Sequence, residues 1–194
     1  MLYIRHRINT VKELETIPEG MGVELDLRDQ HGRMILHHDP FVNGEDFETY
    51  LKSYRQAMMI VNVKSEGLEE KALELLNRNG ISRYFFLDLS FPALMKLVRQ
   101  GEKNIAVRFS EYEPPAQCLA LKGLVDWVWV DCFREIPLTP EIYGILKPHF
   151  KLCLVSPELQ GHSLDRILSF REKLHGMEID AVCTKRPDLW QIAL

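Results

Sequence analysis

The chain has 194 residues, of which 46% are hydrophobic and 27% are charged, and its formal net charge is −4. This composition is unlike that of disordered chains, so we expect a folded globular protein. Lysine and arginine are scattered rather than clustered, which argues against nucleic-acid binding. The sequence shows neither a signal-peptide pattern nor an apolar stretch of 18 residues, so we expect a cytoplasmic protein with no membrane span.

Short apolar runs rich in β-branched and aromatic residues recur along the chain and predict eight strands. Stretches with helical spacing alternate with these runs and predict eight helices, four of which end at a glycine, as helix C termini commonly do. The predicted strands are residues 2–6, 22–27, 57–63, 83–89, 104–109, 125–131, 150–156 and 179–184. The predicted helices are residues 10–17, 45–55, 67–80, 91–101, 114–123, 139–148, 163–176 and 186–194.

Alternating strands and helices predict parallel strand pairing with helices covering the sheet. Eight repeats favour a compact (β/α)8 TIM barrel that forms one domain over residues 1–194, and an open doubly wound sheet is the alternative. Residues 30–33 have the composition of a turn, so residues 34–38 are predicted to form an additional strand or an extended loop after the second strand.

The four cysteines are far apart in the sequence and form no C-x-x-C pair. A zinc site or a disulfide framework is therefore not expected, and the cysteines are predicted to be buried thiols. They are Cys118, Cys132, Cys153 and Cys183.

Polar side chains gather at the ends of the first three predicted strands, where (β/α)8 barrels build their active sites. Glu24 and Asp26 are two residues apart and therefore share one face, and the same holds for Asn62 and Lys64. A hard divalent cation would keep two such carboxylates ionised, which predicts Mg²⁺ or Ca²⁺ bound by Glu24 and Asp26, with Asn62 as a third oxygen donor. Lys64 is predicted to neutralise an anionic substrate.

Two histidines and an arginine complete this cluster. His6 and His38 are candidates for general acid and general base, because histidine titrates near neutral pH. Arg7 is a candidate for binding a phosphate oxygen. A cation, a lysine, an arginine and two histidines around one cavity indicate a phosphoryl-transfer site.

The segments RHRINT, GVELDLRDQHGRMILHHDP and IVNVK resemble the glycerophosphodiester phosphodiesterase family, within the phosphatidylinositol phospholipase C-like barrels. In that family, His-Arg, Glu-x-Asp, His-Asp and an acidic residue two before a lysine follow in this order. The closing segment EIDAVCTKRPDLW is similar to the family's last strand. The resemblance implies that His6 and His38 are the acid–base pair, that Arg7 and Lys64 bind the phosphate, and that Glu24 and Asp26 bind the metal.

Three positions depart from the family pattern. Ile8 stands in place of a glycine and narrows the floor of the site, and Lys185 stands in place of an aspartate. Asn62 stands in place of the family's common metal-binding glutamate and lowers the negative charge offered to the metal.

Further residues could belong to the site. Asp39 lies next to His38, and because the family pattern selects the histidine beside the aspartate, the resemblance implies His38 rather than His37 as the catalytic candidate. Asp88 and Asp131 end apolar runs, so each is either a site residue or the cap of the next helix. Trp129, like Trp127, either contacts the organic part of the substrate or fills the barrel. Ser156 and Glu158 either contact substrate or form a plain loop.

These features predict a metal-dependent phosphodiesterase that cleaves a small, glycerophosphodiester-like molecule by histidine acid–base catalysis. The alternative is a diverged, non-catalytic barrel that binds a phosphorylated metabolite or sugar, because a fold does not guarantee an activity. The attacking hydroxyl is that of water or of the substrate's own neighbouring alcohol. The sequence identifies neither the alcohol groups of the substrate nor the oligomeric state.

Overall fold

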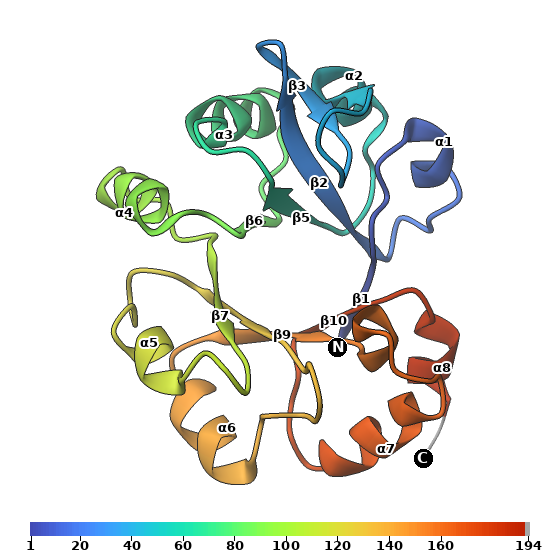
Figure 1. Cartoon of the computed structure of the whole chain (residues 1–194), viewed down its shortest axis with the longest axis vertical. Coiled ribbons are helices and arrows are strands. Elements are labelled where there is room, and N and C mark those ends of the chain that lie inside the picture. The colour runs from blue at the N-terminus through green and yellow to red at the C-terminus, as the bar shows by residue number, and fades with distance from the viewer. Residues whose placement is uncertain (193–194) are drawn as a thin grey trace. The chain divides into compact units, whose positions relative to one another are not determined.

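A computed structural model of the chain describes residues 1–192 (Figure 1). The chain groups into two compact units. The N-terminal unit is Arg5–Ile105, and the C-terminal unit is Met1–Ile4 together with the chain from Ala106 onward. That residues 1–194 form one domain stays a prediction.

The N-terminal unit contains parallel strands with an antiparallel extension on one edge. β2 pairs with β5 and β5 pairs with β6, both in parallel, whereas β3 pairs antiparallel with β2 and with β4. Figure 1 shows α1 to α4 in an arc around these strands. The strands are β2 (Gly22–Gln30), β3 (Arg33–Leu36), β4 (Glu45–Asp46), β5 (Met58–Val63) and β6 (Tyr84–Leu87). The helices are α1 (Val11–Leu14), α2 (Phe47–Ser53), α3 (Glu69–Arg78) and α4 (Phe91–Arg99).

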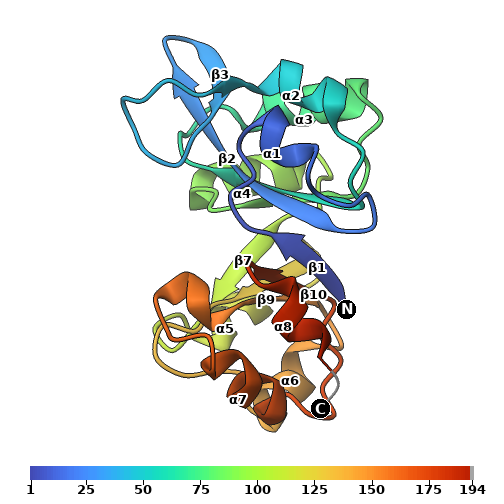
Figure 2. The ribbon, with the colours of Figure 1, turned by 90° about the vertical axis from the view of Figure 1, so that its right-hand side faces the viewer.

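The C-terminal unit is a sheet with the strand order β1-β10-β9-β8-β7, in which β7 to β10 run parallel. Figures 1 and 2 show α5, α6 and α7 on one side of this sheet. The strands are β1 (Leu2–Arg5), β7 (Ala106–Phe109), β8 (Trp127–Val130), β9 (Lys151–Val155) and β10 (Ala181–Thr184). The helices are α5 (Pro115–Leu119), α6 (Pro140–Leu146), the 3₁₀ helix η1 (Pro157–Gln160), α7 (Arg166–Lys173) and α8 (Pro187–Gln191).

The strands and helices lie where the sequence predicts them. Each of the eight predicted strand segments contains a strand, and each predicted helical segment contains a helix; residues 193–194 of the last one lie outside the described residues. The extra segment after the turn is β3. The four glycines predicted to end helices all have positive φ, which is the left-handed conformation that glycine adopts without strain: Gly80, Gly101, Gly123 and Gly176.

β2 explains how polar groups enter the core of the N-terminal unit. Alternation along the strand places Val23, Leu25 and Leu27 on one face and Glu24 and Asp26 on the other, and all five side chains are buried. Two ionisable groups are therefore buried on a strand whose other face packs as ordinary apolar core.

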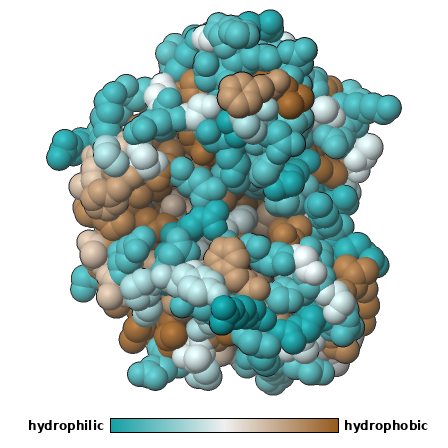
Figure 3. Space-filling view, in the orientation of Figure 1, coloured by the Kyte–Doolittle hydropathy of each residue, from teal (hydrophilic) through white to brown (hydrophobic). Residues whose placement is uncertain are grey.

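All four cysteines are buried, as the sequence predicts. In Figure 3 the side chains over the N-terminal unit are mostly hydrophilic, with hydrophobic ones gathered near α4, where Phe91 is exposed. Among the described residues, none of the helices is long and apolar enough to cross a membrane.

Candidate active site

The candidate site lies at the carboxyl ends of β2 and β5 in the N-terminal unit. Asp26 of β2 stands directly opposite Asn62 of β5 in the strand register, and Glu24 lies two residues before Asp26 on the same face. Lys64 follows β5 and donates its backbone N–H to the Leu27 carbonyl at 2.8 Å. Parallel pairing in this register therefore brings the four predicted polar side chains of β2 and β5 together.

Glu24 is held on both carboxylate oxygens. Its Oε1 accepts a hydrogen bond from Asn62 Nδ2 at 2.9 Å, and its Oε2 accepts one from the backbone N–H of Arg7 at 2.8 Å. His6 Nε2 lies 3.8 Å from the same Oε2. Burial, and next the neighbouring Asp26 carboxylate, raise the pKa of Glu24 to about 7, against the lowering effect of these hydrogen bonds.

Asp26 is held by Asn9, a residue that the sequence analysis did not single out. Asn9 Nδ2 donates to Asp26 Oδ2 at 2.9 Å, and Asn9 Oδ1 accepts from the Asp26 backbone N–H at 2.8 Å. Two cations flank the carboxylate, with Arg7 Nε 4.0 Å from Oδ2 and Lys64 Nζ 3.7 Å from Oδ1. An asparagine two residues after Arg7 carries no distinctive signal, so only the fold reveals its contact.

The backbone is strained at two points of the site. Arg7 has a φ of 55° and Asp88 a φ of 62°, in the left-handed region that residues other than glycine rarely adopt. Such strain gathers at functional sites, where the surroundings enforce it. Asp88 directly follows β6 and its Oδ2 accepts a hydrogen bond from Lys64 Nζ at 3.2 Å. It does not cap the next helix, because Ser90 is the N-cap of α4.

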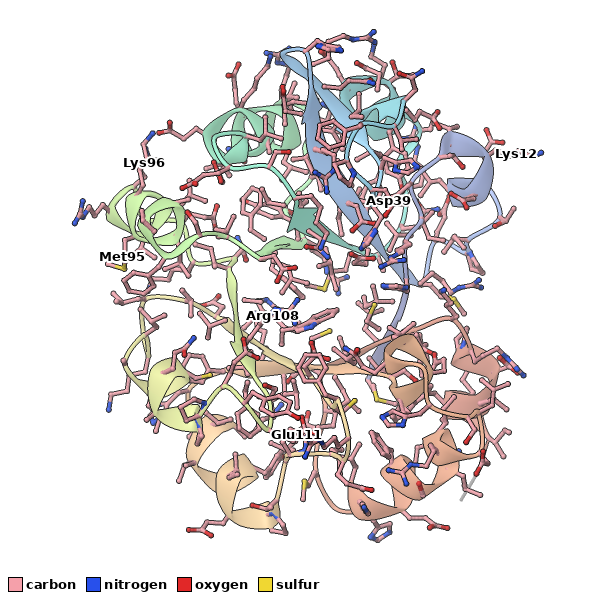
Figure 4. The ribbon with its side chains drawn as sticks, viewed as in Figure 1. Lys12, Asp39, Met95, Lys96, Arg108 and Glu111 are labelled. Atoms are coloured by element: carbon pink, nitrogen blue, oxygen red, sulfur yellow. The ribbon has the colours of Figure 1, made fainter. Side chains whose placement is uncertain are left out.

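The loop that carries His38 is anchored to β2 by its backbone. The His37 N–H donates to the Asp26 carbonyl at 3.0 Å, and Arg28 Nη2 donates to the His38 carbonyl at 2.8 Å. His38 Nδ1 pairs with Asp39 Oδ1 at 2.7 Å, and this bond lowers the pKa of the Asp39 carboxyl. Figure 4 shows Asp39 beside β2.

The same loop passes close to the backbone of β3 at Gly44, where there is no room for a side chain. A Cβ on Gly44 would lie 2.5 Å from the Leu36 carbonyl oxygen, closer than side-chain atoms approach backbone. The His37 side chain stabilises the loop, because its Nδ1 accepts a hydrogen bond from the Asp39 backbone N–H at 3.0 Å. The loop is therefore fixed to β2 at His37 and His38, and Asp39 follows directly.

The donors present fit a divalent cation that keeps several of its waters. Asp26 Oδ1 and Asn62 Oδ1 are buried oxygens without a hydrogen-bond partner among the described residues. Oxygen is the donor that Mg²⁺ and Ca²⁺ prefer, and Mg²⁺ commonly uses only one or two carboxylates of the protein. Within residues 1–192, no three histidine, cysteine, aspartate or glutamate side chains gather to hold an ion, so Asn62 would have to serve as a ligand.

Two further predicted site residues, Asp131 and Trp129, lie in the C-terminal unit. Asp131 is buried, and its oxygens pair with Arg108 Nη1 and with Gln160 Nε2 within that unit. Figure 4 labels Arg108 on β7. Trp129 is buried on β8.

Ser156 and Glu158 form a structural cluster in the same unit. Trp190 Nε1 donates to Ser156 Oγ at 2.7 Å, and Glu158 Oε1 accepts from the Thr184 hydroxyl at 2.5 Å and from the Lys185 backbone N–H at 3.0 Å. These bonds join η1 to the end of β10 and to α8, which accounts for both residues without a ligand.

No protein-family model and no curated protein sequence matches the chain. Solved structures do match it over nearly its whole length. A glycerophosphodiester phosphodiesterase from Agrobacterium tumefaciens is 15% identical, with a TM-score of 0.68, and the match covers 98% of this chain and 99% of that one. A glycerophosphoryl diester phosphodiesterase from Parabacteroides distasonis is 11% identical, with a TM-score of 0.66, and the match covers 97% of this chain and 84% of that one.

These similarities show the fold. The chain is an α/β protein with a mostly parallel sheet and has the (β/α)8 TIM-barrel fold of these phosphodiesterases, as the sequence predicts. The resemblance to the glycerophosphodiester phosphodiesterase family is thereby confirmed at the level of the fold.

Proposed function

We propose that the chain is a phosphodiesterase that cleaves a small, glycerophosphodiester-like substrate by histidine acid–base catalysis with the help of a divalent cation. One observation carries the proposal: His6, Arg7 and Lys64 all lie within 4.0 Å of the buried Glu24 and Asp26 carboxylates. The fold shared with solved phosphodiesterases supports it.

The two histidines would move the protons of the reaction. Because His38 Nδ1 is engaged by Asp39, its Nε2 is the nitrogen that can take or give a proton, and the carboxylate orients the ring. His6 Nε2 lies 3.8 Å from Glu24 Oε2, which places the ring at the candidate site. One histidine would remove the proton of the attacking hydroxyl, and the other would protonate the leaving alkoxide.

The two cationic side chains would hold the phosphate. Arg7 is partly exposed, so its guanidinium can reach a phosphoryl oxygen while its backbone N–H stays on Glu24. Lys64 supplies a second positive charge, beside the other carboxylate oxygen of Asp26. Charge neutralisation and positioning are the main requirements of phosphoryl transfer, and these residues meet both.

The cation would be held by Asp26 and Asn62, with Glu24 beside them. When bound, Mg²⁺ or Ca²⁺ supplies positive charge that polarises a phosphoryl oxygen. Asp26 Oδ1 and Asn62 Oδ1, the buried oxygens without hydrogen bonds, support this assignment.

A non-catalytic protein that binds a phosphorylated metabolite or sugar is the second candidate. Asn62 favours it, because its amide donates to Glu24 where a carboxylate would leave an anionic oxygen for a metal. Such a protein would bind phosphomonoesters through Arg7 and Lys64 and turn over no diester.

The test is a turnover assay with glycerophosphodiesters, phosphoinositides and sugar phosphodiesters, with EDTA or with added Mg²⁺, Ca²⁺ or Mn²⁺. We expect cation-dependent turnover of a diester, and analysis of the phosphorus products separates hydrolysis from cyclic-phosphate formation. His6→Ala and His38→Ala should each lower turnover by about 10²- to 10⁴-fold.

His162→Ala is the matched control, because this histidine contacts the Phe133 carbonyl in the C-terminal unit. It should keep wild-type turnover. Wild-type activity in His6→Ala or His38→Ala contradicts the acid–base assignment. Phosphomonoester binding without turnover of any diester favours the second candidate.

A further inference from the structure

A partly buried ion pair lies beside the candidate active site, between the end of β5 and the end of β6. Lys64 Nζ donates to Asp88 Oδ2 at 3.2 Å and lies 3.7 Å from Asp26 Oδ1. The Lys64 and Asp88 side chains are 19% and 22% exposed, whereas Asp26 is fully buried. The ammonium group therefore has a carboxylate on either side and is held nearer the outer one.

Asp88 occupies this place at a conformational cost. Its φ of 62° is in the left-handed region, where an L side chain crowds the backbone. Capping does not explain the conformation, because the Ser90 hydroxyl accepts the N–H of Ala93 at the start of α4. A residue in an uncommon backbone conformation that is not a cap, with its carboxylate on a lysine of the candidate site, points to a role in that site.

The position of the Lys64 ammonium decides whether Asp26 Oδ1 is available to a cation. This oxygen is buried and has no hydrogen-bond partner among residues 1–192. A lysine ammonium less than 4 Å away is strongly attracted to such an oxygen, because the Coulomb energy grows as the surroundings become less polar. If Lys64 closed on Asp26, it would neutralise the carboxylate and take the oxygen that a divalent cation needs.

The structure assigns to Asp88 the role of a positioning residue that holds Lys64 away from Asp26 Oδ1. The oxygen then stays available to the cation, and the ammonium stays available to the substrate phosphate. This inference rests on the proposed function and extends it to a residue that directly follows a third strand, β6.

The test is Asp88→Asn, which removes the charge and keeps a side chain that tolerates left-handed backbone. Cation affinity is read from the rise in melting temperature during titration with Mg²⁺ and Ca²⁺, a readout that needs no turnover. We expect the cation affinity to fall about tenfold. This is the order of the added repulsion between the cation and the Lys64 ammonium once the ammonium moves closer to Asp26, at an effective dielectric constant of ~20. The KM for a phosphodiester should rise in parallel.

A double-mutant cycle separates positioning from a merely structural role. In a Lys64→Met background there is no ammonium to hold back, so Asp88→Asn should leave the cation affinity unchanged. Asp180→Asn is the matched control, because Asp180 pairs with Lys147 at 2.6 Å with similar exposure in the C-terminal unit. This control should lower the melting temperature and leave the cation-induced shift as it is.

An Asp88→Asn variant with the wild-type cation affinity overturns the inference alone. An equal loss of affinity in the wild-type and Lys64→Met backgrounds overturns it too, because the effect would then not act through Lys64. A wild-type protein with no cation-dependent shift overturns the inference together with the proposed metal dependence, whatever its turnover.

Discussion

The two units both bury carboxylates near the ends of parallel strands, but they treat them differently. In the C-terminal unit, Asp131 pairs through both oxygens with Arg108 and Gln160. In the N-terminal unit, Asp26 keeps one buried oxygen without a hydrogen bond, beside a second buried carboxylate, Glu24. A buried carboxylate with both oxygens hydrogen-bonded stabilises the fold. A buried carboxylate with an unbonded oxygen lowers the free energy of unfolding, which points to a functional rather than a structural role.

The largest effects are expected when each of the two aspartates is neutralised in a separate variant, which tests the difference between the two units directly. Asp26→Asn should lower turnover by about 10²-fold or more, because it removes the negative charge that would hold the divalent cation. Its melting temperature should rise, since repulsion between two buried carboxylates is lost.

Asp131→Asn should have the opposite effects: turnover should be kept and stability should fall. Breaking its partly buried ion pair with Arg108 is expected to lower the free energy of unfolding by about 1–3 kcal/mol. Denaturant titrations and turnover assays of both variants check the pair of predictions. A stability loss in Asp26→Asn equal to that in Asp131→Asn would remove the distinction between the two units.

Asn9→Ala sharpens the comparison by testing what holds Asp26. It removes both side-chain bonds to Asp26 and leaves the Asp26 backbone N–H without its acceptor, which should cost about 1–3 kcal/mol of stability. Turnover should fall by about 10-fold, because a displaced site carboxylate is costly. Asn79→Ala, whose amide contacts the Leu75 carbonyl in the same unit, is the control and should keep turnover.

Gly44→Ala tests the loop that carries His38. The added Cβ would lie 2.5 Å from the Leu36 carbonyl oxygen, so the loop must shift, at about 1–3 kcal/mol of stability and with reduced turnover. Gly144→Ala is the matched control in α6, where a Cβ meets nothing within 4 Å, and it should raise stability by about 1 kcal/mol. Thermal unfolding and turnover assays of the two variants check these predictions, and a Gly44→Ala variant with wild-type stability and turnover would contradict the first.

The smallest effect is expected at a buried thiol of the C-terminal unit. Burial raises the pKa of Cys118 to about 12, so this thiol stays protonated and unreactive at pH 8. Iodoacetamide should modify it slowly in the folded protein and rapidly after denaturation, as mass spectrometry of the peptide would show. Rapid modification of the folded chain would mean that this unit opens readily.

The sequence predicted the elements because their signals are local. Period-two alternation places Glu24 and Asp26 on one face of a strand, and glycines such as Gly80 stop helices through their own backbone freedom. The same locality identified the residues of the candidate site, since the polar groups stand at strand ends that a parallel sheet brings to one edge. These features depend on neighbours within a few residues.

Contacts between distant segments were decided only by the tertiary structure. The pairing of Asp26 with Asn9 joins residues 17 apart, and that of Lys64 with Asp88 joins residues 24 apart. Asp88 has the same sequence context as a helix cap, and only the register of β5 and β6 places it on Lys64. A residue type states which bonds a side chain can make, whereas strand register and loop anchoring decide which of them it makes.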